Sequence, residues 1–202
     1  SDEVAIAGNH ALLSTNDGLY ILNVSNPAAP VKVGSYAASG SVYVSGNLAY
    51  VTGSDGLRVL NVTNPSTPIA LGGYSTPLNV QGVAVGGNHA YLATGSGGLR
   101  AFNIANPSVP IAVGSVDTPS FARNIALAGN YAYVSDGISG LRIISVANPT
   151  APDEVGFFDT PGYAYDVAVA GIYAYVADDE MGLRILNVAN PAAPKQVGYH
   201  DT

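Results

Sequence analysis

Three acidic side chains stand in a row near the C-terminal end of the chain: Asp178, Asp179 and Glu180. Because Ca²⁺ takes oxygen ligands, adjacent carboxylates of this kind are a candidate calcium site. The chain has no EF-hand spacing, and acidic residues in a turn are also commonly just solvated. We therefore expect no cofactor other than, at most, Ca²⁺ at these three residues.

A second set of residues combines one cation, one anion, amides and aromatic rings, a mixture suited to polar recognition. It comprises Asn79, Gln81, Arg123, Asn124, Tyr163, Tyr165 and Asp166. The alternative is that Arg123 and Asp166 form only a structural ion pair or are solvated. Aromatic faces can stack on sugars, so Tyr163 and Tyr165 also point to a glycan as a ligand.

The residues that catalysis would need are few. His10, His89 and His200 share no metal-ligand spacing, and no G-x-S-x-G elbow is present. Glycosidases use two carboxylates, whereas the strands expected at the centre of the fold offer only Asp166 and, at most, Glu3. We therefore predict that the protein is not an enzyme, with a hydrolase using the central site as the least favoured alternative.

Arginine recurs at one fixed place beside a Gly-Leu pair: Arg58, Arg100, Arg142 and Arg184. Aspartates recur with similar regularity at Asp117, Asp159 and Asp201. Because arginine suits bidentate pairing with carboxylates, we expect structural ion pairs within or between repeated units.

These residues are positioned by an internal repeat. Asn-Pro recurs at Asn26, Asn64, Asn106, Asn148 and Asn190, with spacings of 38, 42, 42 and 42 residues. Two glycine series, starting at Gly18 and Gly34, keep the same spacing. The 202 residues thus form one domain of five units, at about 1–38, 39–78, 79–120, 121–162 and 163–202.

Each unit reads as four short strands bounded by Gly, Asn or Pro, which predicts an all-β chain. In the fifth unit the strands fall at 166–170, 173–176, 182–188 and 195–200. Five such units indicate a five-bladed β-propeller with four antiparallel strands per blade. We expect the first strand of each blade to be innermost, and each blade to be built from contiguous sequence. We also expect the ring to close with unit 5 against unit 1.

The strand order predicts two different ends of the propeller. The repetitive Asn-Pro and Gly-Asn turns fall on one end, the bottom, where they serve as turn residues. The variable junctions between units fall on the other end, the top. Because binding residues often lie in loops on a rigid scaffold, we place the candidate binding site on the top.

Composition excludes several classes. The net charge is −7, which repels phosphate backbones, so nucleic acid is not expected as a partner. No apolar run reaches 18 residues, so we expect no insertion into a membrane. The chain has no cysteine, and therefore no disulfide or thiolate metal site.

The segments YAYVSDGISGLRIISVANPTAPDEVGFFDTPGYAYDVAVAG and YAYVADDEMGLRILNVANPAAPKQVGYHDT resemble the LVIVD repeat, which is similar to the YVTN propeller repeats. The resemblance covers essentially the whole chain. It implies a propeller in a secreted or cell-surface protein of bacteria or archaea, acting as an interaction or surface module. We therefore predict a structural or protein-binding module that engages a protein partner or assembles with itself, with glycan binding as the main alternative.

Overall fold

The computed structural model describes residues 3–202 and contains five sheets of four antiparallel strands. The first blade contains β1 (Glu3–Ala7), β2 (His10–Thr15), β3 (Gly18–Asn23) and β4 (Val31–Tyr36). The second contains β5 (Ser41–Ser45), β6 (Leu48–Gly53), β7 (Gly56–Asn61) and β8 (Ile69–Tyr74). The third contains β9 (Gly82–Gly86), β10 (His89–Ala93), β11 (Leu99–Asn103) and β12 (Ile111–Val116).

The fourth blade contains β13 (Asn124–Ala128), β14 (Tyr131–Ser135), β15 (Leu141–Ser145) and β16 (Asp153–Phe158). The fifth contains β17 (Asp166–Ala170), β18 (Tyr173–Ala177), β19 (Leu183–Asn187) and β20 (Lys195–His200). A single turn of 3₁₀-helix, η1 (Asp179–Met181), joins β18 to β19. The expectation that each blade uses contiguous sequence is confirmed, because strands pair in chain order within every sheet. None of the helical structure in residues 3–202 is long and apolar enough to cross a membrane.

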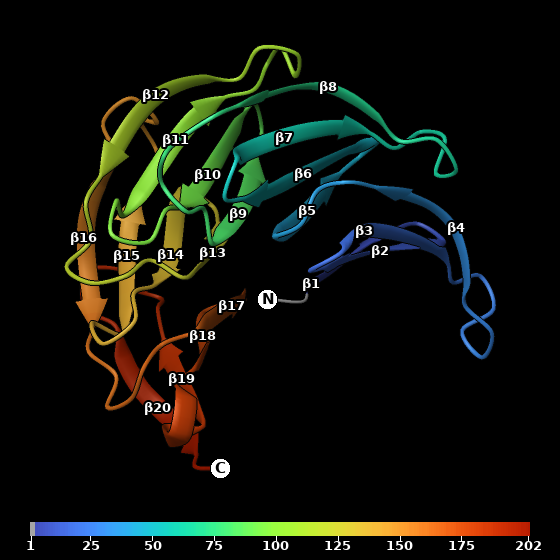
Figure 1. Cartoon of the computed structure of the whole chain (residues 1–202). Helices are drawn as coiled ribbons and strands as arrows, with labels where there is room; N and C mark the ends of the chain where they lie inside the picture. Colours follow the sequence, from blue (N-terminus) through green and yellow to red (C-terminus); the bar gives the residue numbers. More distant parts are fainter. Residues whose placement is uncertain (1–2) are drawn as a thin grey trace.

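The first strand of each blade is innermost, as expected. These strands contact one another in the order β1, β5, β9, β13, β17, and Figure 1 shows them at the centre of the molecule. Apart from β5, which has Tyr43 at a small position, they alternate branched aliphatic residues with small ones, as in Ile125-Ala126-Leu127-Ala128, which lets neighbouring blades approach closely near the axis. The core is divided accordingly into apolar clusters between adjacent sheets, each built from residues of two or more blades.

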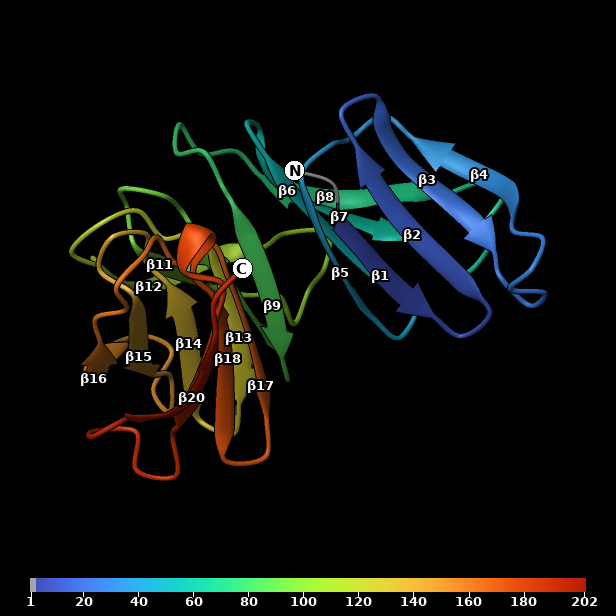
Figure 2. The same cartoon turned by 90° about the horizontal axis from the view of Figure 1, so that it is seen from below.

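The expected ring closure is wrong. No contact comparable to those between successive inner strands joins β17 back to β1 in the described residues, and Figure 1 shows an opening between the first and fifth blades. The view from below in Figure 2 shows the same separation. The five blades therefore form an arc and not a circle.

The bottom turns have the structural role that the sequence predicts. In the first of them, the Asn26 side-chain oxygen accepts a hydrogen bond from the Ala28 backbone N–H, and the Asn26 carbonyl accepts one from that of Ala29. The same pattern recurs at Asn64, Asn106, Asn148 and Asn190. These asparagines therefore hold turns that preset the direction of the outermost strand.

Candidate top-face binding site

The entries of the fourth and fifth blades, just before β13 and β17, bring five of the predicted site residues together. The Arg123 guanidinium carbon lies 5.2 Å from the centroid of the Tyr163 ring and 4.9 Å from that of Tyr165. Its Nε donates a hydrogen bond of 3.3 Å to the Tyr163 hydroxyl. Next to it, the Asn124 amide donates to the Asp166 carboxylate at 2.6 Å. Arg123 thus packs against aromatic rings, while the predicted anion pairs with an amide.

A third ring, which sequence reasoning left out of the site, completes the group. The Phe121 centroid lies 5.0 Å from the Arg123 guanidinium carbon. Phe121 stands 42 residues before Tyr163, so it occupies the same place in the preceding repeat, and that offset was the available signal. Each of these two rings covers a glycine with positive φ in the loop of the preceding blade: Phe121 covers Gly95, and Tyr163 covers Gly137. A side chain at either glycine would collide with the ring, so the glycines fix where the aromatics lie.

Backbone hydrogen bonds hold this group in place. The N–H groups of Arg123 and Tyr165 donate to the last residues of β14 and β18, Ser135 and Ala177, at 2.8 Å each. The Ser135 hydroxyl also donates to the Tyr165 carbonyl at 3.1 Å, which links the two blades. Tyr165 remains 45% exposed, so its ring is available to a ligand. We call Phe121, Arg123, Tyr163 and Tyr165 the arginine–aromatic cluster.

Asn79 and Gln81 lie elsewhere on the top. They line a separate hollow of about 290 Å³ together with the Ser39-Gly40-Ser41 junction and residues of the first two blades. Gln81 is the equivalent of Arg123 and Tyr165, since its N–H donates to the last residue of β10, but Asn79 stands at the position that Phe121 and Tyr163 occupy. The seven predicted residues therefore divide between two places on the top face.

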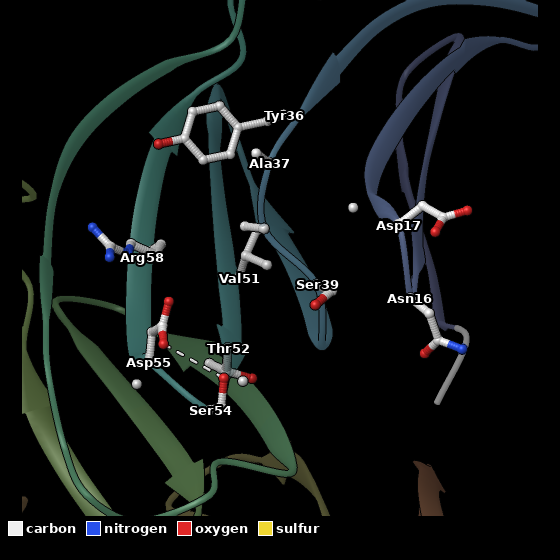
Figure 3. Close-up of a pocket in the computed structure, with 14 residues that line it drawn as sticks. Asn16, Asp17, Tyr36, Ala37, Ser39, Val51, Thr52, Ser54, Asp55 and Arg58 are labelled. Atoms are coloured by element: carbon white, nitrogen blue, oxygen red, sulfur yellow. Dashed lines mark hydrogen bonds between the residues drawn. The ribbon is translucent and has the colours of Figure 1, made fainter.

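A pocket lies between the first and second blades (Figure 3). It has a volume of about 380 Å³, and Asp17, Asp55, Arg58, Asn16 and Tyr36 are among its lining residues. Arg58 is exposed, unlike its counterparts in later blades, and like Arg100 it makes no ion pair within residues 3–202. Sequence reasoning missed this pocket because Arg58 was assigned a structural ion pair and the turn residues Asn16, Asp17 and Asp55 were not considered.

The predicted structural ion pairs form in two of the four repeats. Arg142 contacts Asp159 at 3.0 Å and Glu154 at 3.6 Å, and Arg184 contacts Asp201 at 2.9 Å. All three pairs lie within a blade. Both arginines also stack on an aromatic ring of the outermost strand. Arg100, by contrast, has no ion pair in the part of the chain that the structure describes.

The three carboxylates proposed for Ca²⁺ do not converge. Asp178 is fully buried, where it accepts hydrogen bonds from the Thr160 hydroxyl and the Gly162 N–H and lies 3.5 Å from Arg184. Asp179 and Glu180 are exposed. Among residues 3–202, no three acidic or histidine side chains are arranged to hold a metal ion. The geometry gives no support to this calcium candidate, because Asp178, the first of its ligands, already ties down the blade junction.

The fourth blade repeats this arrangement. Asp136 is buried and accepts hydrogen bonds from the Thr118 hydroxyl at 2.6 Å and the Ser120 N–H at 2.9 Å. Burial raises the pKa of Asp136, while these hydrogen bonds and the charge of Arg142 oppose the rise. Asp136 and Asp178 thus anchor the two Asp-Thr-Pro junctions that lead into the arginine–aromatic cluster.

Glu3 is the other titratable group near the centre of the fold. Its carboxylate accepts hydrogen bonds from the Ser41 hydroxyl and the Val42 N–H of the next blade. Burial raises the pKa of Glu3, these hydrogen bonds lower it, and the negative charge of Asp166 raises it further. Glu3 therefore joins the first two inner strands by hydrogen bonds, and the Asp166 charge of the fifth blade contributes to its raised pKa.

Comparison with known proteins fits this architecture. The model of the LVIVD repeat matches five times, at residues 1–38, 37–76, 79–118, 121–160 and 161–202. The chain belongs to the LVIVD-repeat family. No curated protein matches the sequence of this LVIVD protein.

Solved structures resemble the LVIVD chain in fold alone, since sequence identities are low. A protein from Lactobacillus plantarum superposes with a TM-score of 0.82 at 13% identity, over 98% of this chain and 70% of that one. The computationally designed protein Ika8 gives 0.76 at 9%, covering 98% and 62%. BamB from Moraxella catarrhalis gives 0.64 at 16%, covering 98% and 60%. The LVIVD chain therefore spans less than two thirds of the length of Ika8 and BamB.

Proposed function

We propose that this protein is a non-enzymatic interaction module that binds a protein partner through the arginine–aromatic cluster on its top face. The supporting observation is Arg123 packed among three rings, with Tyr165 left exposed beside it. Arg and Tyr are among the residues that contribute most to binding energy in protein interfaces. The rings hold the guanidinium in one orientation, so less side-chain entropy is lost on binding.

The cluster is also asymmetric, which a specific site requires. The bottom turns repeat the same asparagine chemistry five times, whereas among residues 3–202 only the segments that lead into β13 and β17 carry the cation and its three rings. The neighbouring Asp166 carboxylate and Asn124 amide add an acceptor and a donor at its edge. A peptide segment with a carboxylate or backbone carbonyls for Arg123 and an apolar face for Tyr165 fits this surface best.

A displayed peptide library tests the proposal. Peptides selected on the wild-type chain should lose at least tenfold in affinity for Arg123→Ala and Tyr165→Ala. Arg58→Ala is the matched control, because it removes an exposed arginine from the same face outside the cluster. Selected peptides that bind all four proteins equally would refute the cluster as the binding site.

Glycan binding is the second candidate, and the pocket between the first two blades favours it. That pocket offers carboxylates, an arginine, an amide and a tyrosine, which are groups that can bond sugar hydroxyls. A glycan array should show specific binding that Asp55→Ala and Arg58→Ala abolish. If binding instead depends on Tyr163 and Tyr165, the sugar uses the cluster, and if no glycan binds, this alternative fails.

We also propose that the protein works outside the cell or at the cell surface of a bacterium or archaeon. The support is the resemblance to LVIVD proteins described above. Labelling of intact cells with an impermeant amine reagent should modify the protein in the native host. Protection until the cells are lysed would overturn this location.

A further inference from the structure

The two ends of the arc expose side chains that every internal blade buries. In β1, Val4 is 58% exposed, whereas the equivalent residues Val42, Val83, Ile125 and Val167 are 3–6% exposed. In β19, Leu183 is 37% exposed, whereas Leu19, Leu57, Leu99 and Leu141 are 0–1% exposed. Each position carries a branched aliphatic residue in all five blades. The faces at both ends therefore have the chemistry of a blade–blade interface but lack the second blade.

A glycine in the outermost strand shows what the missing neighbour looks like. At Gly156 an added Cβ would lie 2.2 Å from the Pro191 carbonyl oxygen of the next blade's Asn-Pro turn. Gly34, Gly72 and Gly114 face the following turn in the same way. At Gly198, in β20, the only atoms near an added Cβ belong to Ile185 of the same blade. Gly198 thus keeps the space for an Asn-Pro turn that no described residue fills.

The size of the opening limits what can fill it. The five blades superpose on 60–70% of the length of longer chains, among them the propeller protein BamB. If five blades take that share of a ring, the remainder is about two or three blades, within the range of known propellers. A second five-blade copy is too large to fit the opening and close it.

We propose that the two end faces are docking surfaces for further blades of the LVIVD repeat, two or three of which complete the ring. The four internal blade–blade interfaces support this proposal, because they show which residues of a neighbouring blade each end face would contact. An added blade after the fifth covers Leu183 and places its Asn-Pro turn on Gly198. A blade before the first covers Val4. This inference does not depend on the arginine–aromatic cluster.

Two extended chains test it. Appending a second copy of residues 119–202 after Thr202 gives seven blades, and appending residues 77–202 gives eight, both in register with the repeat. In the parent chain, Leu183→Ala should lower Tm by less than half as much as Leu141→Ala, its buried counterpart. A buried Leu→Ala change should lower Tm by about 5–15 °C in a chain of this size. In the extended chain that closes, the original Leu183→Ala should reach the Leu141→Ala effect.

The other end gives an independent readout. Val4→Ala should have little effect in the parent chain, and it should match Val83→Ala in the closed chain. If Leu183 becomes critical and Val4 does not in both extended chains, the added blades stack without closing, and the proposal is overturned. Failure of both extended chains to unfold cooperatively would also overturn it, because the faces then do not accept the repeat.

Sedimentation velocity of the parent chain tests whether a second copy of the chain covers the end faces instead. A concentration-dependent oligomer that Val4→Asp or Leu183→Asp dissociates would assign the end faces to a second copy and refute the proposal. A parent chain that stays monomeric, or whose oligomer is unaffected by both changes, agrees with it. Binding by the arginine–aromatic cluster should survive in either extended chain, so failure here is distinct from failure of the proposed function.

Discussion

Replacing Arg142 tests how the blades are held together. The buried guanidinium contacts Asp159 and Glu154, stacks on Phe157, and lowers the pKa of Asp136. We expect Arg142→Ala to reduce the free energy of unfolding by about 2–3 kcal/mol. The two partly exposed ion pairs contribute about 0.5 kcal/mol each, and stacking on the ring contributes about 0.5–1 kcal/mol. The remainder comes from leaving the Asp136 charge buried without a nearby cation.

The loss should depend on pH. Because burial raises the folded-state pKa of Asp136, its neutral form is the stabilising one. The contribution of neutral Asp136 to the free energy of unfolding is complete below its unfolded-state pKa. It is lost as the pH rises through its folded-state pKa. The ionised carboxylate needs Arg142 most, so Arg142→Ala should cost more at pH 7 than at pH 4. In an Asp136→Asn background this pH dependence should shrink, and the difference between the two backgrounds reports the contribution of Asp136.

Urea unfolding followed by circular dichroism at the two pH values measures these quantities. A loss of 2–3 kcal/mol corresponds to a decrease in Tm of about 5–10 °C for a chain of this size. Arg58→Ala is the control, since this exposed arginine has no ion pair within residues 3–202. A loss below about 0.5 kcal/mol, or one equal to that of the control, would refute the structural role of Arg142.

Three further outcomes follow from the structure. Gly156→Ala should lower Tm strongly, because its Cβ would meet the Pro191 carbonyl oxygen, whereas Gly198→Ala should be tolerated in the same melting assay. The stability of Glu3→Gln relative to wild type should increase as the pH rises from 4 to 7, because the raised pKa of Glu3 makes its ionised form costly in the folded wild type. Urea unfolding of both proteins at pH 4 and pH 7 checks this. Millimolar Ca²⁺ should leave Tm unchanged and give no calorimetric heat, since Asp178 already accepts two hydrogen bonds; a saturable heat would contradict the arrangement described.

Local structure could be predicted from the sequence because the repeat encodes it locally. The spacing of Asn-Pro and of the Gly-Leu pairs placed four strands in each unit, and the alternation of small and branched residues placed the first strand at the centre. Closure could not be predicted. The residues at each blade–blade interface are the same whether the array ends or continues, so Val4 and Leu183 look like core residues in the sequence.

The candidate site was predicted in part for the same reason. Arg123 and Tyr165 are equivalent positions in successive repeats, which places them on neighbouring blades at one level. Asn79 and Gln81 belong to the junction between the second and third blades, so they line another hollow. The run of acidic residues at 178–180 was only a candidate for calcium, and the sequence does not reveal that one of them, Asp178, points inward to Thr160.

The open arc also changes how this molecule should lose its structure. In a closed ring every blade has two neighbours, so no blade can unfold without breaking two interfaces. Here the first and fifth blades have one neighbour each, and an array of this kind unfolds as a one-dimensional series with weak ends. Amide hydrogens of β1 and β19 should therefore exchange earlier than those of β11, which lies in the middle blade. The same sequence motif would then have a lifetime set by its distance from the nearest end.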